Sequence, residues 1–222
     1  MTTEAQVLDI FTQTGAIITG DHMVYTSWRH GTDYVDPDKI YLHPKETETL
    51  CEEIARQFVW DDVEVVVGPG IGGKILSRWV AYHLSQKKPS NERTLAFHTD
   101  KLPNGDIVFA RGGAKNYIPG KKVLAVEDVM TTGGTAKKLI EATRRIGGIV
   151  VGLGVLCIRG KVTLADVSNP PKMFSLIKLA MNSWAREECE RIGPCSRGVP
   201  INVEVGHGRE FLASRHRGER VS

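Results

Sequence analysis

The sequence has little of several features that mark specialised protein classes. It contains only four cysteines, at irregular spacing, in a chain of 222 residues, so a disulfide framework is neither needed nor indicated. No apolar stretch reaches the roughly 20 residues that span a bilayer, and no basic segment followed by an apolar one predicts a signal peptide. The net charge of +3 is small and demands neither nucleic acid nor an anionic membrane as partner. We therefore expect a protein of the reducing cytoplasm.

Length and composition are those of an ordinary globular protein. Hydrophobic residues make up 41% of the chain and charged residues 25%, which is the usual balance for a folded domain. A chain of this length can bury one substantial core, or a core with a small appended subdomain. The basic stretch 209–220 near the C-terminus is short, and we predict a solvated tail there.

The most informative segment comprises residues 123–135. It begins with an apolar run, Val123–Val126, that predicts a buried strand, continues with the acid pair Glu127-Asp128, and ends in the threonine and glycine loop 131–135. Residues 136–145 then have the pattern of an amphipathic helix. Unpaired backbone N–H groups and the positive end of the helix dipole meet at such a junction, so the segment predicts an anion site.

The side chains of this segment limit the kinds of ligand that the site could bind. The hydroxyls of Thr131, Thr132 and Thr135 add donors for a phosphate monoester. Glu127 and Asp128 would repel a phosphate, but they suit sugar hydroxyls or a hard cation beside it. Phosphoribosyl pyrophosphate (PRPP) carries a phosphate, a diol and a metal-binding group close enough together to contact all of these side chains. The simpler alternative is two surface acids and an ordinary turn before a helix, and the order strand, acids, loop, helix favours the ligand site.

A second glycine-rich junction precedes this one. Val63–Val67 predicts a strand, Gly68–Gly73 a loop almost free of side chains, and Lys74–Leu84 a helix. Backbone amides in such a loop can approach an anion closely. Taken alone, the loop is weak evidence for an anion site, because a turn whose glycines serve only packing has the same pattern.

Ile149–Ile158 predicts a further buried strand. With the two strand–helix units described above, it makes strands alternate with helices along the chain. The alternation predicts an α/β fold with parallel strands and right-handed crossovers, in which ligands bind at the carboxyl ends of the strands. Before this core, residues 44–58 predict an amphipathic helix. Residues 14–41 are rich in glycine and aromatic side chains and predict a subdomain of short strands and turns.

Residues 123–135 closely resemble the PRPP-binding signature of the type I phosphoribosyltransferases. The resemblance implies an α/β fold, with a mostly parallel sheet flanked by helices and a small N-terminal hood subdomain. It implies a hood and base-binding segment at 1–45, a phosphoribosyltransferase core at 46–200, and a C-terminal segment with a solvated tail at 201–222. It also implies that the glycine loop presents N–H groups to pyrophosphate through a strained peptide.

The resemblance assigns site residues as well. It assigns PRPP binding to Glu127, Asp128, Val129, Met130, Thr131, Thr132, Gly133, Gly134 and Thr135. It assigns the pyrophosphate loop to Pro69, Gly70, Ile71, Gly72 and Gly73. The candidate catalytic residues are Glu127, Asp128 and Lys101. No protein ligand to a metal is implied, because Mg²⁺ would be bound mainly through PRPP.

Residues 20–34 resemble the base-binding entry segment of the orotate phosphoribosyltransferases. With the arginine after the strand at 149–158, they assign base binding to Ser27, Trp28, Arg29 and Arg159. Trp28 stands where that family has glycine, and Thr26 stands where many members have lysine. Arg159 matches the arginine that pairs with the orotate carboxylate, for which a bidentate guanidinium is suited.

Residues 101–111 resemble the lid of one subgroup of this family. Lys101 matches the loop lysine and Arg111 the hairpin arginine, and the turn Pro103-Asn104-Gly105 suits a mobile segment that excludes water. Both charges are equally consistent with solvated loop positions.

The activity that the resemblance implies is displacement of pyrophosphate from PRPP by a ring nitrogen of a base, orotate being favoured. Mg²⁺ would be the cofactor and a homodimer the assembly, with no nucleic acid or membrane partner. A transferase for another base and a non-catalytic PRPP-sensing regulator are the alternatives. Lys101 and Arg159 favour the enzyme, because a regulator can lose both residues.

Cysteine and histidine residues raise one further possibility. Cys189 and Cys195 could bind zinc with His207, but they lack the tight Cys-x-x-Cys spacing of most zinc sites. Isolated histidines such as His22, His30 and His207 are more often hydrogen-bonded residues than ligands. The sequence therefore does not predict a zinc site.

Overall fold

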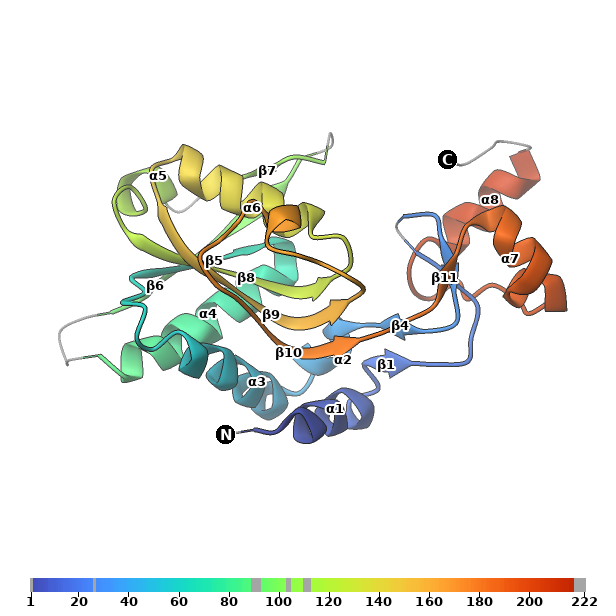
Figure 1. Ribbon diagram of the computed structural model, residues 1–222, viewed down its shortest axis with the longest axis horizontal. Helices are drawn as coiled ribbons and strands as arrows, with labels where there is room; N and C mark the ends of the chain where they lie inside the picture. Colours follow the sequence, from blue (N-terminus) through green and yellow to red (C-terminus); the bar gives the residue numbers. More distant parts are fainter. Residues whose placement is uncertain (1, 26, 89–92, 103–104, 110–112, 218–222) are drawn as a thin grey trace. The chain divides into compact units, whose positions relative to one another are not determined.

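The structure is a computed structural model that describes residues 2–25, 27–88, 93–102, 105–109 and 113–217, with side chains described as far as Ser214. The chain forms two compact units, one made of residues 1–10 and 40–179 and the other of residues 11–39 and 180–222. Figure 1 follows the chain through both units.

The larger unit is built on a six-stranded sheet. Its strands, in spatial order, are β10 (Met173–Leu179), β9 (Ile149–Arg159), β8 (Lys122–Met130), β5 (Val65–Pro69), β6 (Leu95–Lys101) and β7 (Ile107–Val108). Neighbouring strands are parallel except β6 and β7, which form an antiparallel pair. Every residue of β5 is buried, as expected for a central parallel strand covered on both faces. The predicted α/β fold with a mostly parallel sheet is confirmed.

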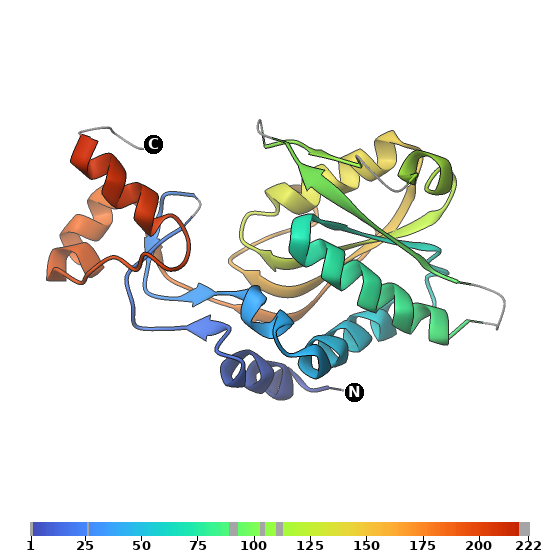
Figure 2. The same ribbon diagram turned by 180° about the vertical axis from the view of Figure 1, so that it is seen from behind.

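Helices cover both faces of this sheet (Figure 1 and, from behind, Figure 2). One face carries α3 (Pro44–Gln57) and α4 (Gly70–Gln86), which contact each other, and the other carries α6 (Gly134–Arg145). Helix α6 matches the predicted pattern, because Ala136, Leu139 and Ile140 are buried whereas Lys137 and Lys138 are exposed. The shorter elements of this unit are α5 (Ala114–Tyr117) and the 3₁₀ turn η1 (Ala165–Val167), while α1 (Glu4–Gln13) and α2 (Pro37–Tyr41) run across the boundary between the units.

The strand order changes direction between β5 and β8. From β5 the chain passes through α4 to β6 on one side, whereas from β8 it passes through α6 to β9 on the other. The two helices that follow β5 and β8 therefore begin at the same edge of the sheet, and we call the switch point between their starts the crevice. Such a switch point is where open α/β sheets bind ligands.

The smaller unit combines two distant parts of the chain. Its three-stranded sheet has the order β11 (Ser183–Trp184), β3 (His30–Gly31), β2 (Met23–Val24), and a separate pair joins β1 (Ile17–Ile18) to β4 (Tyr34–Val35). It also contains α7 (Arg186–Ile192), the 3₁₀ turn η2 (Pro194–Arg197) and α8 (Gly208–Arg217). The short strands predicted within residues 14–41 are present.

The C-terminal region differs from the sequence prediction. Residues 208–217 form α8 rather than a solvated tail, because Phe211 is buried with its ring centroid 4.9 Å from that of His30. The units also divide the chain differently from the expected boundaries 1–45, 46–200 and 201–222. Strand β11 pairs with β3, which joins residues 180–222 to residues 11–39 in one unit.

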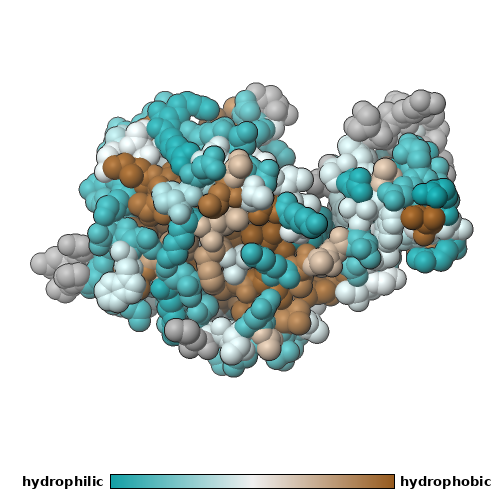
Figure 3. All heavy atoms as spheres, viewed as in Figure 1, coloured by the Kyte–Doolittle hydropathy of each residue, from teal (hydrophilic) through white to brown (hydrophobic). Residues whose placement is uncertain are grey.

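The surface of the larger unit is not uniformly polar. In the view of Figure 3, apolar surface gathers over the region where β9 and β10 run in Figure 1. Met173, Phe174 and Leu179 of the edge strand β10 are half-buried. Among the helices that the structure describes, none combines the length and apolarity needed to cross a membrane.

Candidate active site

The first side of the crevice is the junction of β5 and α4. The strand continues through Pro69 and the helix begins at Gly70, so Gly70–Gly73 form the first helical turn and not the predicted loop. The predicted loop is wrong on this point, because the close packing of Gly68 on Gly73 lets these glycines form a helical turn. The consequence favours anion binding, since the first-turn N–H groups of a helix have no partner within it.

Close backbone packing explains why this turn is made of glycine. A Cβ on Gly68 would lie 2.3 Å from the carbonyl oxygen of Gly73, and a Cβ on Gly73 would lie 2.3 Å from the carbonyl carbon of Gly68. Gly70 has φ +58°, and a Cβ placed on it would meet nothing within 4 Å, so this residue borders open space. All peptide bonds of the described residues are trans. Ile71 is exposed on this turn.

The second side of the crevice is the junction of β8 and α6. Glu127 and Asp128 lie inside β8 and not after it, because β8 pairs with β9 as far as Met130 opposite Ile158. Their side chains therefore occupy successive strand positions on opposite faces. The strand is longer than the apolar run that predicted it.

Glu127 is a buried acid with an unused oxygen. Its side chain is 6% exposed, and its Oε2 has no hydrogen-bond partner within the described residues. Burial, and after it the charge of Asp128, raises the pKa of Glu127 well above its usual value. An unsatisfied buried carboxylate oxygen is costly, and a hydroxyl donor from a ligand would satisfy it.

Asp128 links the two sides of the crevice. Its Oδ1 accepts a hydrogen bond from the Val129 backbone N–H at 2.6 Å, and its Oδ2 accepts one from the Tyr41 hydroxyl at 3.3 Å. A Cβ on Gly72 would lie 2.1 Å from the same Oδ2. The acid pair of β8 and the glycine turn of α4 are therefore direct neighbours. The sequence did not single out Tyr41, whose signal is only an aromatic residue before His43-Pro44.

The threonine loop follows at the end of β8. Thr131 and Thr132 are exposed, and Gly133 has φ +80° and precedes α6, whose first two residues are Gly134 and Thr135. A Cβ on Gly133 would lie 2.7 Å from Val167 Cγ1, so both the backbone angle and the space require glycine. Met130 is buried behind the loop. The predicted donors thus stand at a helix N-terminus, on residues exposed to solvent.

Arg159 lies at the end of β9 beside this loop. Its side chain is 9% exposed, and its Nη2 donates to Thr131 Oγ1 at 3.4 Å. A buried guanidinium at the carboxyl end of a strand is a directional anion-binding group. Arg159 is therefore brought to the same edge of the sheet as Glu127 and Asp128.

The predicted lid is in part a β-hairpin. Lys101 is the exposed last residue of β6 and pairs with Ile107 of β7, while Arg111 lies outside the described residues. Lys138 of α6 donates to the Gly105 carbonyl at 2.7 Å and lies 3.6 Å from Asp106. The hairpin thus contacts α6 about one turn after the threonine loop, and the sequence did not single out Lys138 as its contact.

The remaining base-binding candidates belong to the smaller unit. Ser27 and Arg29 are exposed, and Arg29 donates to the Ser183 carbonyl at 2.7 Å. Trp28 has φ +60°, the left-handed conformation that glycine adopts most easily. Its ring centroid lies 4.9 Å from that of His207. Trp28 therefore has a backbone conformation typical of glycine. Thr26 lies outside the described residues.

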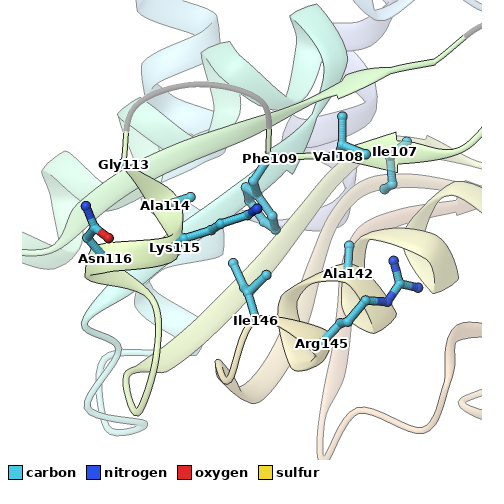
Figure 4. A pocket seen from close by; sticks show the side chains of 10 residues that line it. All are labelled: Ile107, Val108, Phe109, Gly113, Ala114, Lys115, Asn116, Ala142, Arg145 and Ile146. Carbon is cyan, nitrogen blue, oxygen red and sulfur yellow. The ribbon is translucent and has the colours of Figure 1, made fainter.

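A cavity of about 650 Å³ lies elsewhere in the larger unit. Figure 4 shows the side chains of Phe109, Lys115 and Ile146 around it. It borders Ala142, Arg145 and Ile146 at the C-terminal end of α6, whereas the threonine loop is at the N-terminal end. No residue of the predicted PRPP site lines it, and we do not assign it to the substrate.

Known proteins with similar sequences identify the family of this chain. A family model described as a phosphoribosyl transferase domain matches residues 38–190. The orotate phosphoribosyltransferase of Pelotomaculum thermopropionicum is 36% identical over 198 residues, which cover 89% of this chain and 95% of that protein.

Solved structures agree at the level of the fold. The orotate phosphoribosyltransferase of Mycobacterium tuberculosis superposes with a TM-score of 0.60 at 21% identity, covering 79% of this chain and 96% of that one. An adenine phosphoribosyltransferase of Rhodothermus marinus gives 0.54 at 24% identity, covering 79% and 99%. At these identities the structures establish a shared fold and do not discriminate between bases.

Proposed function

Because the chain belongs to the orotate phosphoribosyltransferase family, we propose that it transfers the phosphoribosyl group of PRPP to orotate, releasing pyrophosphate in pyrimidine nucleotide synthesis. The observation that carries the proposal is the crevice between β5 and β8. It combines the first-turn amides of α4 with an acid pair, of which Glu127 is buried, and with a threonine-rich helix N-terminus. A ligand with a pyrophosphate, a diol and a phosphate monoester uses all three.

Each side of the crevice has a separate task in this proposal. The amides of Gly70–Gly73 bind the pyrophosphate, and the hydroxyls and amides of the loop 131–135 bind the 5′-phosphate. Glu127 and Asp128 accept hydrogen bonds from the ribose hydroxyls. The negative charge of Asp128 also stabilises the positive charge that develops on the ribose as the pyrophosphate leaves.

Mg²⁺ is the cofactor that we propose. The residues fit its use through the substrate, because the buried oxygen of Glu127 and the carboxylate of Asp128 suit ribose hydroxyls and leave the pyrophosphate oxygens to the metal. When bound, Mg²⁺ would neutralise charge on the leaving group. Lys101, at the end of β6, would add a positive charge to the same group when the hairpin segment closes.

Arg159 is the residue that favours orotate over other bases. Orotate carries a carboxylate, and a buried guanidinium pairs with a carboxylate through two parallel hydrogen bonds. Ser27, Trp28 and Arg29 stay base-binding candidates on the family resemblance alone. Uracil lacks the carboxylate and would leave the guanidinium without its charged partner.

Assembly and location complete the proposal. We propose a homodimer, which sedimentation at working concentration would test. A reducing cytoplasm is supported by the four cysteines, none of which forms a disulfide among the described residues. Cys51 and Cys157 of the larger unit are fully buried. We propose no nucleic acid or membrane partner.

One assay tests the proposal. Purified protein with PRPP and Mg²⁺ is supplied with orotate, uracil or adenine, and pyrophosphate release is measured. We expect orotate to be used fastest, and Arg159→Ala to lower the orotate rate by about tenfold or more, as loss of a charged hydrogen bond implies. Arg78→Ala, at an exposed position of α4, is the matched control and should leave the preference unchanged. Faster use of uracil or adenine would refute orotate, and PRPP binding without any turnover would indicate a regulator.

A further inference from the structure

Four potential metal ligands meet in the smaller unit. They are His22, which immediately precedes β2, His30 of β3, Cys189 of α7 and Cys195 of η2. Their ligand atoms all lie within 4.8 Å of one another. None of the four takes part in the proposed transferase chemistry. The cluster differs from the possibility raised by the sequence, because His22 and His30 replace His207, which lies against Trp28.

The distances are close to those of a tetrahedral metal site. His22 Nε2 lies 2.9 Å from His30 Nδ1, 3.5 Å from Cys195 Sγ and 3.8 Å from Cys189 Sγ, and Cys195 Sγ lies 3.5 Å from His30 Nδ1. Around zinc, bonds of about 2.0–2.1 Å to nitrogen and about 2.3 Å to sulfur imply N···N separations of about 3.3 Å and N···S separations of about 3.6 Å. Small movements of four side chains would therefore bring all four atoms to one ion.

Hydrogen bonds around the cluster orient the ligands. His22 Nδ1 lies 2.8 Å from the Val199 carbonyl oxygen. A carbonyl can only accept, so Nδ1 carries the proton and the Nε2 lone pair points into the cluster. The Cys195 backbone N–H donates to Cys189 Sγ at 3.4 Å, which stabilises negative charge on that sulfur. Metal-binding histidines and thiolates in proteins have such outer partners.

Burial and redox state are consistent with a metal. His22, His30 and Cys189 are at most 1% exposed, and both cysteines are free thiols. Two sulfur and two nitrogen donors suit zinc and not Mg²⁺, which prefers oxygen. A cavity of about 350 Å³ lined in part by His22, Cys195 and Val199 gives the ion a route to the cluster.

We propose that His22, His30, Cys189 and Cys195 bind one zinc ion. Four protein ligands fill a tetrahedral zinc coordination sphere, so the site is structural and holds no water for catalysis. The ion joins the β2–β3 hairpin to α7 and η2, and Cys189 is separated from His22 by 167 positions in the sequence. A small unit formed from two distant chain segments gains folding free energy from such a crosslink.

The first test is metal content. The full chain, purified without chelator or a histidine tag, is analysed by elemental mass spectrometry, and we expect about one zinc per chain. Cys189→Ser and His30→Ala should lose the zinc. Cys157→Ser, at a buried thiol of β9 outside the cluster, and Asp128→Asn, at the predicted substrate site, should keep it. Zinc retained by Cys189→Ser as well as by Cys157→Ser would overturn the proposal.

The second test does not depend on the variants folding. Wild-type protein is exchanged with Co²⁺, and the visible spectrum should show tetrahedral d–d bands with thiolate charge-transfer bands. X-ray absorption of the zinc protein should give two sulfur neighbours at about 2.3 Å and two nitrogen neighbours at about 2.0 Å. A protein that takes up neither ion, a spectrum without thiolate ligands, or a Cys189–Cys195 disulfide in the intact protein kept under reducing conditions would each refute the site.

Discussion

The two junctions that border the crevice offer a ligand different chemistry. After β5, the turn Gly70–Gly73 presents backbone amides, and the packing of Gly68 on Gly73 excludes side chains from their contact. After β8, the strand and loop present carboxylates and hydroxyls. The first junction therefore needs residues without a Cβ, so that its backbone segments can pack closely. The second needs side chains of particular chemistry.

This difference predicts two classes of mutational effect. At the β5–α4 junction, an added methyl group should damage packing, and therefore stability. At the β8–α6 junction, removal of a charge or a hydroxyl should change binding and turnover and leave the fold intact. Substitutions at both junctions test the distinction.

Asp128→Asn should lower kcat by about 10²–10³, a loss of about 2.7–4 kcal/mol of transition-state stabilisation typical of a missing electrostatic contact. The amide keeps the volume of the side chain, and its one oxygen can still accept either from the Val129 N–H or from the Tyr41 hydroxyl, so the melting temperature should change little. Steady-state kinetics and thermal denaturation provide the two measurements. Full activity in this variant would show that the charge of Asp128 takes no part in catalysis.

Thr132→Val should weaken PRPP binding about tenfold or more, since a hydrogen bond to a charged group contributes about 1.5–3 kcal/mol. Calorimetric titration with PRPP and Mg²⁺ measures the affinity. Thr12→Val, at an exposed position of α1, is the control and should bind as the wild type does. Equal affinities in the two variants would remove Thr132 from the phosphate site.

Gly73→Ala should lower the free energy of unfolding by about 1–3 kcal/mol, as overpacking does, because its Cβ would meet the Gly68 backbone at 2.3 Å. Gly72→Ala is the comparison within the same turn. Its Cβ would meet the movable Asp128 carboxylate, so it should lose less stability and more activity. Chemical denaturation and turnover distinguish them, and the reverse ranking would contradict the packing explanation.

Glu127→Gln should have the smallest effect on stability and the most informative pH dependence. The pKa of Glu127 is raised in the folded protein, so the native state holds the proton more tightly than the unfolded state does. Stability linked to this proton is complete below the unfolded pKa and is lost as pH rises through the folded pKa. The variant should therefore become more stable than the wild type as pH increases, while losing activity.

Thermal denaturation from about pH 5 to 8 measures this difference between the two proteins. Glu187→Gln, at an exposed position of α7, is the control and should track the wild type at each pH. A difference between wild type and Glu127→Gln that does not change with pH would show that Glu127 is not held protonated by burial.

Local sequence is sufficient to predict the β8–α6 junction. Strand, acids, loop and amphipathic helix are contiguous, and the observed α6 begins two residues before the predicted one. The α/β class follows from the same alternation. The glycine turn differs from its prediction because tertiary packing of Gly68 on Gly73 overrides the poor helix propensity of glycine.

Long-range contacts cannot be predicted from local patterns. Tyr41 reaches Asp128 across 87 positions, and Cys189 approaches His22 across 167. No spacing rule connects residues so far apart, and Cys189 and Cys195 are not spaced as Cys-x-x-Cys. For the same reason the sequence predicts a tail where α8 forms, since the burial of Phe211 beside His30 depends on the folded smaller unit.

The central claim is that both junctions bind one PRPP molecule. The most direct measurement is a titration of ¹⁵N-labelled protein with PRPP and Mg²⁺, followed through the backbone amide resonances. We expect the amides of Gly70–Gly73 and of Thr131–Thr135 to shift together with a single dissociation constant. Shifts confined to one junction, or absent from both, would contradict the account.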